Sequence, residues 1–411
     1  MAMRILISIV VRLYSMAVLL AAPFNGKARL WINGRKRLLE RIADAVANDD
    51  HPVWIHSASL GEYEQARPII EKIRKERPNT KILATFFSPS GYEIRKNDPL
   101  PDYVFYLPID TVRNARRFLR IVRPSMAIFV KYEFWYNYMI ELTDNSIPFY
   151  YVSAIFRPNQ YFFKPYGRWF VTRLRGASRI FVQNDESAQL LAGVGIRQVE
   201  VCGDTRFDRV AAIAQQSAPV EMAENFKKHS KLIVAGSTWG PDEALLAQLL
   251  PKLNGYKLLV APHEISRKEE VMRTFSDFKT IAYSEIQNQE LGEYDVLVVD
   301  TIGLLNKLYK YSTLSYVGGA FKTGLHNILE AAVYGVPLFF GPKYSHFNEA
   351  VMLVQKGGAF PVNNAGEMWQ VVQRFEDNPE AYARVCAVCR EYVAANVGAC
   401  ERIYQQIFEC V

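Results

Sequence analysis

The sequence predicts an α/β protein with two successive doubly wound parallel sheets. Short runs rich in β-branched and aromatic residues alternate with helical stretches over residues 49–210, and the alternation returns over residues 231–395. The length of 411 residues exceeds one ordinary core, so we expect two domains. Half of the residues are apolar and 22% are charged, which is typical of globular protein and excludes a disordered chain.

Strand-like runs recur through the first half of the chain. They are Val53–His56, Lys81–Phe87, Tyr103–Leu107, Met126–Val130, Pro148–Ser153, Arg179–Gln183 and Val199–Cys202. We expect helices between them, among others from about Gly61 to Arg77 and over Val112–Val122. Ligands of such sheets bind beyond the carboxyl ends of the strands. The loops that follow the strands are therefore where we expect the functional residues.

The second half repeats the pattern after a polar, Ala-rich stretch over residues 211–230, which we interpret as a linker. Its strand-like runs are Lys231–Ala235, Tyr256–Ala261, Thr280–Tyr283, Asp295–Val299, Thr313–Val317 and Pro337–Phe340. From Gly366 the chain is expected to be helical, with residues 396–411 forming a C-terminal helix. The resulting arrangement is two Rossmann-like domains that face each other across a cleft.

The N-terminal segment, residues 1–48, has a composition of its own. Ile5–Ala22 is almost wholly apolar, is interrupted by Arg12, and reaches only the lower length limit for spanning a bilayer. Basic residues follow it, which marks the cytoplasmic side of a membrane; they are Lys27, Arg29, Arg35, Lys36, Arg37 and Arg41. We interpret the segment as a membrane anchor or interfacial helix, and the alternative is a helix packed on the protein itself.

Charge and cysteine usage narrow the function further. The net charge of +7 indicates an anionic partner, and nucleic acid, a membrane surface and a phosphorylated substrate all fit. The cysteine count is odd, and Cys386-x-x-Cys389 has no second pair at zinc-ribbon spacing, so reduced thiols in a reducing cytoplasm are expected. The six histidines show no ligand spacing, and we expect no metal site and no cofactor.

The loop after the first predicted strand carries Ser59, Gly61 and Glu62. It places Glu62 at a helix N-terminus, where the helix dipole would lower its pKa. An ionised carboxylate facing a cleft suits the removal of a proton from a hydroxyl nucleophile. The alternative is an ordinary first-turn glutamate that only caps its helix.

Two further loops of the first half carry charged residues. Lys131 and Glu133 follow the strand Met126–Val130 and precede an aromatic run, which suits a sugar ring beside one carboxylate, or else a structural ion pair under aromatic residues. Arg206 follows the strand Val199–Cys202 and suits a phosphate, or else is surface charge at a domain edge.

In the second half, small residues and histidines follow the strands. Gly236, Ser237 and Thr238 precede a clear helix start and suit an anion, and His263 suits a base or a phosphate. The stretch Gly318–Pro342 predicts a strand–Gly–helix–strand unit. Its members of interest are Gly318 and Gly319 in the turn, His326 and Asn327 at the helix opening, and Glu330 about one turn into the helix. The alternative is an ordinary βαβ unit.

Taken in order, these loops resemble the Kdo transferases, which move 3-deoxy-D-manno-octulosonic acid (Kdo) from CMP-Kdo to a lipid A precursor in lipopolysaccharide biosynthesis. The resemblance runs from the N-terminal apolar helix to near Pro342 or beyond. The segments that carry it are Ser59–Glu62, Lys131–Trp135, Gly203–Asp208, Gly236–Thr238, Gly318–Gly319, His326–Glu330 and Phe340–Pro342.

The resemblance implies a GT-B glycosyltransferase with the acceptor on the N-terminal half and CMP on the C-terminal half. It implies inverting, metal-independent transfer at the cytoplasmic face of the inner membrane, with no nucleic-acid partner. Glu62 matches the catalytic base of the family, and Glu133 matches a second acidic residue near the transferred sugar. The second-half residues named above fall on the nucleotide side, with Glu330 as the ribose contact.

The chain also departs from the family pattern. Arg206 stands where the family often has Lys, His263 lies in an altered Ala-Pro-Arg-His segment, and Leu304 replaces an acidic residue. Three other functions remain open from the residues: another nucleotide-sugar transferase with a lipid-linked acceptor, a sugar-nucleotide 2-epimerase, and a non-catalytic membrane scaffold. A transferase for another donor would prefer UDP to CMP, and an epimerase would release a free sugar.

Overall fold

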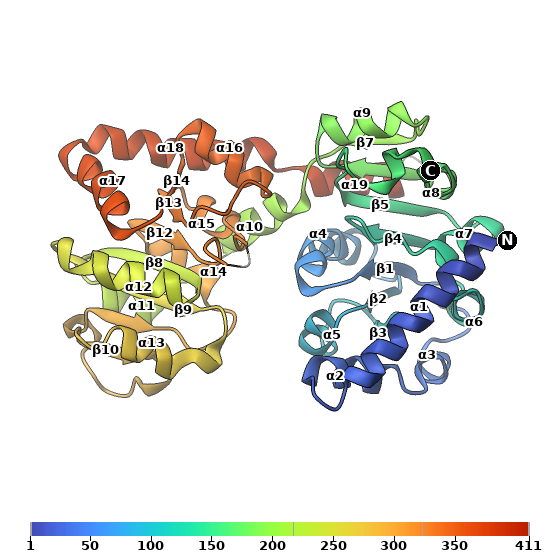
Figure 1. Cartoon of the computed structure of the whole chain (residues 1–411), viewed down its shortest axis with the longest axis horizontal. Helices are drawn as coiled ribbons and strands as arrows, with labels where there is room; N and C mark the ends of the chain where they lie inside the picture. Colours follow the sequence, from blue (N-terminus) through green and yellow to red (C-terminus); the bar gives the residue numbers. More distant parts are fainter. Residues whose placement is uncertain (1, 217, 323, 410–411) are drawn as a thin grey trace. The chain divides into compact units, whose positions relative to one another are not determined.

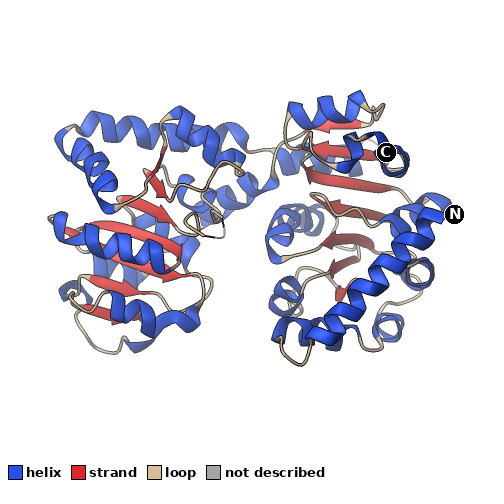
Figure 2. Ribbon diagram, in the orientation of Figure 1, coloured by secondary structure: helices blue, strands red, loops and turns tan. Residues whose placement is uncertain are grey.

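The computed structural model describes residues 2–216, 218–322 and 324–409. The chain divides into two compact units. Unit 1 runs up to Arg209 and also includes the residues from Val397 onward, whereas unit 2 is Val210–Asn396. Each unit contains a parallel sheet of seven strands covered by helices on both faces, which confirms the predicted fold class (Figure 1, Figure 2).

The sheet of unit 1 has the strand order β3-β2-β1-β4-β5-β6-β7, and every neighbouring pair is parallel. All of its strands were predicted within a residue or two. They are β1 Val53–Ser57, β2 Ile82–Phe86, β3 Tyr103–Tyr106, β4 Met126–Val130, β5 Phe149–Ala154, β6 Arg179–Val182 and β7 Val199–Val201.

Successive residues of β1 point to opposite faces of this sheet, as the strand period of two requires. Trp54 belongs to a buried cluster with Phe118 of α6, whereas Ile55 belongs to a second cluster with Ile69 of α4. The helices of unit 1 are α1 Ala2–Ala21, α2 Gly26–Arg35, α3 Leu38–Ala45, α4 Leu60–Glu76, α5 Pro89–Arg95, α6 Val112–Val122, α7 Tyr136–Asp144, α8 Arg168–Leu174, α9 Asp185–Gly193 and α19 Ala399–Phe408, with 3-10 turns η1 Tyr161–Phe163 and η2 Pro165–Gly167.

The last helix, α19, packs on α4 in unit 1. Ile403 and Tyr404 lie in the same buried cluster as Ile69. The Asp208 carboxylate accepts hydrogen bonds from the backbone N–H groups of Gly398 and Cys400, at 2.8 and 3.3 Å. A segment far away in the sequence therefore completes the covering of the helix that carries Glu62.

The sheet of unit 2 has the order β10-β11-β9-β8-β12-β13-β14. The sequence missed β14, and β8 extends over the Gly-Ser-Thr segment that was predicted to follow it. The strands are β8 Lys231–Thr238, β9 Tyr256–Pro262, β10 Thr280–Ala282, β11 Val296–Val298, β12 Leu314–Val317, β13 Leu338–Phe340 and β14 Ala359–Pro361.

Two helical regions differ from the prediction. The stretch interpreted as a linker is mostly helical, since α10 and α11 occupy much of it. The helix expected to open near His326-Asn327 begins later, at Leu329, and has only four residues. The helices are α10 Thr205–Gln216, α11 Glu221–Lys227, α12 Gly240–Leu249, α13 Lys268–Thr274, α14 Leu305–Leu308, α15 Leu329–Ala332, α16 Asn348–Lys356, α17 Ala365–Asp377 and α18 Pro379–Asn396, with 3-10 turns η3 Leu250–Lys252, η4 Ile265–Arg267, η5 Tyr283–Glu285, η6 Leu291–Glu293 and η7 Tyr309–Tyr311.

The N-terminal helix α1 lies along unit 1 beside α2, α6 and α7 (Figure 1). Arg4 holds its start in place, because its guanidinium forms an ion pair with Glu141 and a hydrogen bond with Asn137 on α7. The segment Met3–Ala21 is long and apolar enough to cross a membrane by length and composition. Its outer face exposes a row of large apolar side chains, among them Ile5, Leu6, Ile9, Val10, Leu13, Met16, Leu19 and Leu20.

The described cysteines, Cys202, Cys386, Cys389 and Cys400, are free thiols and are buried, whereas Cys410 lies outside the described residues.

Candidate active site

Glu62 occupies the third position of α4 and closes a capping box with Ser59. Its Oε2 atom accepts hydrogen bonds from the Ser59 backbone N–H at 2.8 Å and from the Ser59 hydroxyl at 2.9 Å. Among the described residues nothing donates to the other carboxylate oxygen, Oε1, and the whole residue is only 8% exposed. One oxygen is thus fixed by the helix start, and the other is available to a ligand.

The pKa of Glu62 is raised to about 7. Burial is the largest cause and the negative charge of Glu133 is the second, whereas the Ser59 hydrogen bonds and the Lys131 charge oppose the shift. The expectation that the helix N-terminus lowers this pKa is therefore wrong, because loss of water and a neighbouring carboxylate outweigh the capping interactions. A carboxylate that titrates near neutral pH has the basicity required of a general base.

Glu133 lies in the loop between β4 and α7 and is held by an aromatic residue. The Trp135 indole donates a hydrogen bond of 2.9 Å to Glu133 Oε2. Among the described residues no ion pair joins Lys131 to Glu133, and the Lys131 ammonium lies 5.5 Å from the centroid of the Tyr132 ring instead. Lys131 also has a left-handed backbone (φ 62°), a strained conformation for a non-glycine residue. The predicted Lys–Glu pair is not formed, although the predicted aromatic surroundings are present.

His56 is a member of this site that the sequence did not single out. It is fully buried, and its Nε2 atom lies 3.6 Å from Glu133 Oε2. Its Nδ1 atom lies 2.9 Å from the Thr85 hydroxyl, which already accepts the Trp54 indole N–H at 2.7 Å. Either the ring nitrogen or the hydroxyl can donate in this contact, because the roles depend on the tautomer of the ring. The Nε2 atom faces the Glu133 carboxylate and has no hydrogen-bond partner among the described residues.

Arg206 is engaged by a buried carboxylate. Asp204 accepts from Arg206 Nε and Nη2, both at 2.8 Å, and from Gln65 Nε2 at 2.8 Å. Burial alone would raise the pKa of Asp204, but the guanidinium and these hydrogen bonds hold it below the usual value. The arginine that was predicted for a phosphate therefore also neutralises Asp204 in unit 1.

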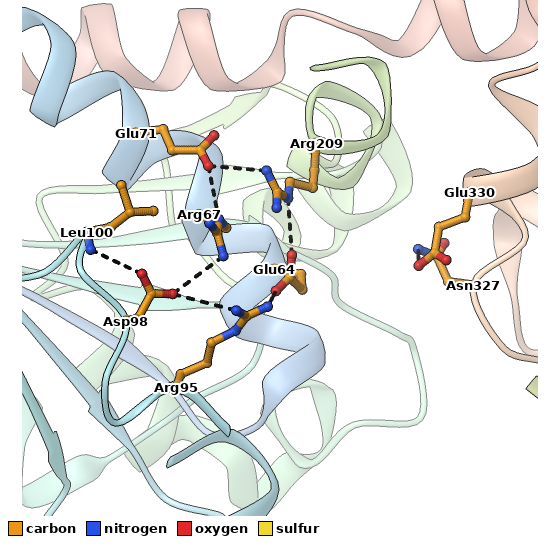
Figure 3. Close-up of polar contacts among 9 residues, drawn as sticks. All are labelled: Glu64, Arg67, Glu71, Arg95, Asp98, Leu100, Arg209, Asn327 and Glu330. Carbon is orange, nitrogen blue, oxygen red and sulfur yellow. Dashed lines mark hydrogen bonds and ion pairs between the residues drawn. The ribbon is translucent and has the colours of Figure 1, made fainter. Parts of the chain in front are cut away.

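A network of ion pairs fixes the remainder of α4 (Figure 3). Glu64 accepts from Arg95 Nη2 at 2.7 Å and from Arg209 Nε at 3.1 Å, which joins α4 to α5 and α10. The members of the whole network are Glu64, Arg67, Glu71, Arg95, Asp98 and Arg209. Because the network begins two residues after Glu62, it limits the freedom of the helix that presents the carboxylate.

In unit 2, the predicted glycines lie where the ends of β8 and β12 approach each other. The N–H of Gly318 donates to the Gly236 carbonyl at 2.9 Å. A Cβ atom on Gly318 would come within 2.7 Å of Thr238 Cα, and Gly319 has a φ of 96°, which favours glycine. Asp242, which the sequence placed only in a helix start, accepts from the N–H groups of Gly319 at 3.1 Å and Trp239 at 2.9 Å.

Thr238 and Ser237 are held differently. Thr238 is buried, and its hydroxyl donates to Glu243 Oε1 at 2.9 Å. The Arg267 guanidinium donates two hydrogen bonds of 2.9 and 2.7 Å to the same carboxylate, and Glu243 is completely buried. Ser237 has a left-handed backbone (φ 53°) at the end of β8. The sequence missed Arg267, which lies 24 positions from its partner.

The two predicted histidines of unit 2 stack on each other. The His263 and His326 rings are 4.3 Å apart at an interplanar angle of 19°, and Trp239 lies 5.1 Å from His263. Burial, reinforced by His263, lowers the pKa of His326 to about 4. Trp239 Nε1 donates to His326 Nε2 at 3.3 Å, so the proton of the neutral His326 ring is on Nδ1.

Asn327 and Glu330 form one pair, in which Asn327 Nδ2 donates to Glu330 Oε1 at 3.0 Å (Figure 3). The helix expected to open at His326-Asn327 begins only at Leu329 and has four residues, so both residues lie in the loop before α15. Over the ranges that the structure describes, no group of three or more His, Cys, Asp and Glu side chains is arranged to hold a metal ion.

Comparison with known proteins connects this geometry to a family. Residues 35–209, which include Ser59, Glu62, Glu133 and Arg206, match the family model described as 3-deoxy-D-manno-octulosonic-acid transferase (kdotransferase). The 3-deoxy-D-manno-octulosonic acid transferase of Haemophilus influenzae is 27% identical over 390 residues, which covers 90% of each chain. The chain is a glycosyltransferase related to the Kdo transferases. The Aquifex aeolicus transferase of the same name is 27% identical to this glycosyltransferase over 79% of the chain and 86% of its own length.

Solved structures show the same fold at lower identity. UDP-GlcNAc 2-epimerase from Neisseria meningitidis, bound to UDP-GlcNAc, aligns with a TM-score of 0.64 at 15% identity, over 87% of the glycosyltransferase and all of that chain. MurG from Acinetobacter baumannii aligns with a TM-score of 0.55 at 13% identity, also over 87% of this chain and all of its own. At these identities the likeness concerns the fold of the glycosyltransferase alone.

Proposed function

We propose that the protein transfers Kdo from CMP-Kdo to a hydroxyl of a lipid A precursor, with inversion at the anomeric carbon and with Glu62 as the general base. The observation that carries the proposal is the buried Glu62 carboxylate, whose pKa is about 7 and whose Oε1 atom has no hydrogen-bond donor among the described residues. The relation to the Kdo transferases supplies the substrate class.

In the proposed step, Glu62 removes the proton of the acceptor hydroxyl while the oxygen of that hydroxyl forms a bond to the anomeric carbon. The bond from that carbon to the phosphate oxygen breaks, and CMP leaves with its electron pair. Glu133 lies close enough to Glu62 to raise the pKa of that carboxyl, so it strengthens the base. No metal or cofactor takes part in the proposed step.

The predicted nucleotide residues are assigned to CMP. Gly236, Gly318 and Gly319 are assigned to this side for their backbone, and each is needed for close packing because a Cβ atom would clash with Tyr309, Thr238 and His326, respectively. Glu330 is proposed to contact the ribose through hydroxyl hydrogen bonds. Ser237, Thr238, His263, His326 and Asn327 complete the proposed donor side, and Ser59, Gly61, Lys131 and Arg206 the acceptor side.

We place the enzyme at the cytoplasmic face of the inner membrane, with α1 on the membrane surface. The exposed apolar face of α1 and the basic residues after it support this location. The acceptor is itself a membrane lipid, so a membrane-bound enzyme meets it without extraction.

A product assay tests the proposed reaction. The protein is incubated with CMP-Kdo and a lipid A precursor, and the glycolipid is weighed by mass spectrometry. We expect the mass of the acceptor to rise by that of Kdo residues and CMP to be released. Transfer from a UDP-sugar instead would indicate a different GT-B transferase, and release of a free sugar without acceptor modification would indicate an epimerase.

Gly61 offers a test of where the acceptor lies. No atom lies within 4 Å of a Cβ built on this residue, and no positive φ requires glycine, so Gly61→Ala fits the folded structure. Because alanine favours the helix, we expect the free energy of unfolding to rise by about 0.5–1 kcal/mol. If the acceptor contacts this backbone, the KM for the acceptor should rise while the KM for CMP-Kdo stays the same. An unchanged acceptor KM would remove Gly61 from the acceptor site.

A further inference from the structure

Helix α6 presents a row of arginines on the face opposite to its buried side. The row begins at Arg113. Arg116, Arg117 and Arg120 follow it by three, four and seven positions, which puts all four on one face of a helix. Ala115, Phe118, Leu119 and Val122 point to the core. Like charges at these spacings repel one another, so the row is unfavourable unless an anion neutralises it.

The row faces α1 across a pocket of about 500 Å³. Helix α1 adds Ile5, Ser8, Ile9 and Arg12 to the lining, so five guanidinium groups line one pocket. Of these five arginines, only Arg116 has an ion-pair partner among the described residues, Glu141 at 3.1 Å. The guanidinium groups of the other four form no hydrogen bond or ion pair within the described parts of the chain. The pocket therefore carries a large positive charge that the chain itself does not balance.

The margin of this pocket is apolar. Ile5 is 52% exposed and Ile9 is 46% exposed, and they belong to the exposed apolar face of α1. A second pocket of about 450 Å³ adjoins it, since Arg117 lines both. Leu19, Trp31, Leu39 and Ile109 supply apolar surface there. Lys36 supplies positive charge, whereas Arg37 is paired with Glu40 at 3.4 Å. Positive charge next to exposed apolar surface fits the boundary between headgroups and acyl chains.

We propose that the pocket between α1 and α6 binds the phosphate headgroup of an anionic phospholipid, whose acyl chains lie against the exposed face of α1. The proposal rests on the membrane location given above. The ligand is assigned as a phospholipid of the bilayer and not as the acceptor lipid. The reason is that α6 covers one face of the sheet, whereas α4, which begins at the proposed acceptor site, covers the opposite face. In this arrangement α1 lies in the plane of the membrane interface and keeps its contacts with α2, α6 and α7.

The test measures vesicle binding and needs no transfer reaction. The full-length protein is sedimented with phosphatidylcholine vesicles that contain phosphatidylglycerol, and with vesicles of phosphatidylcholine alone. A third set of phosphatidylcholine vesicles contains the lipid A precursor. We expect preferential binding to the anionic vesicles. A triple variant, Arg113→Gln, Arg117→Gln and Arg120→Gln, should bind them on the order of a hundredfold more weakly, because each arginine near an anionic surface contributes roughly fivefold. Raising salt from about 0.1 M to about 1 M should remove most of the preference.

A matched control removes the same charge elsewhere, with Lys310→Gln, Lys356→Gln and Arg384→Gln in unit 2. This control should keep the binding of the wild-type protein. Neither variant should have a lower melting temperature than the wild type, because all six side chains are exposed and the pocket variant loses only repulsion between like charges. Equal binding by the wild type and the pocket variant overturns the proposal, as does equal loss in the control. If the pocket variant loses binding only to vesicles that contain the lipid A precursor, the pocket belongs to the acceptor site and the phospholipid proposal is wrong. Each of these outcomes can be measured even if the protein shows no transferase activity.

Discussion

Glu62→Gln is expected to slow Kdo transfer by about 10²–10⁴-fold while CMP affinity stays nearly unchanged. The amide keeps the size of the side chain and can still accept from Ser59, but it cannot take a proton from the acceptor. Initial rates with CMP-Kdo and a lipid A precursor measure the first effect, and the CMP-induced rise in melting temperature measures the second. In the wild type, kcat/KM should increase with pH through about 7 as the Glu62 carboxyl loses its proton.

The same variant should be more stable than the wild type at alkaline pH. The folded pKa of Glu62, about 7, lies above its ordinary value of 4.5, so the folded state binds the proton more tightly than the unfolded state. Ionised Glu62 therefore destabilises the fold above pH 7, and protonation relieves this as the pH falls toward 4.5. A neutral amide should raise the free energy of unfolding above pH 7 by about 1–2 kcal/mol.

Glu64→Gln is the matched control for this experiment. It makes the same chemical change on the same helix, at a carboxylate that is bound by Arg95 and Arg209. We expect its transfer rate to remain within a fewfold of the wild type. Full activity of the Glu62 variant would remove the general-base assignment, and an equal loss in both variants would indicate that α4 is disturbed and that the carboxylate is not the cause.

Arg267→Gln is expected to destabilise unit 2 by about 3–5 kcal/mol. The substitution leaves the Glu243 carboxylate completely buried without the guanidinium that now binds both of its oxygens. An uncompensated buried charge costs far more than the lost hydrogen bonds. Chemical denaturation at neutral pH measures the change. The CMP-induced rise in melting temperature should fall as well, because Thr238 hydrogen-bonds to the same carboxylate.

Two controls separate charge burial from general disturbance. Glu270→Gln removes the exposed partner of Arg267, whose ion pair is 2.8 Å long, and should cost less than about 1 kcal/mol. The double variant Glu243→Gln with Arg267→Gln removes both buried charges and should recover much of the lost stability. If the double variant is as unstable as Arg267→Gln alone, burial of the unpaired Glu243 charge is not the cause.

Much of the fold was predictable because local chemistry agrees with the tertiary structure. Helix α6 was predicted with its observed limits, since Thr111 caps its start and Arg123 adopts a left-handed conformation at its end. By contrast, β14 has three residues and only one of them is buried, so the sequence shows no hydrophobic periodicity that would predict this strand. The helix expected to open near His326 begins only at Leu329, after Gly324, whose φ of 113° favours glycine.

For the candidate site, the sequence predicted which loops carry the residues of interest, but it did not predict the contacts and pKa shifts of those residues. Ser59 and Glu62 are recognisable from their spacing, which is that of a capping box. The raised pKa of Glu62 depends on burial and on Glu133, which is 71 positions away in the numbering and is brought close by the pairing of β1 with β4. His56 was missed because a lone buried histidine has no pattern until its partners are known.

The placement of α19 has a consequence for how the protein is made. The ribosome releases this helix only after all of unit 2, yet α19 covers α4 and bonds to Asp208 in unit 1. Domains generally fold in the order of their synthesis. Here the first domain to emerge leaves the outer side of its Glu62-bearing helix uncovered until translation of the second is finished. A nascent chain arrested before Ala399 should therefore expose Ile69 and its apolar neighbours to chaperones, and the active site would mature last.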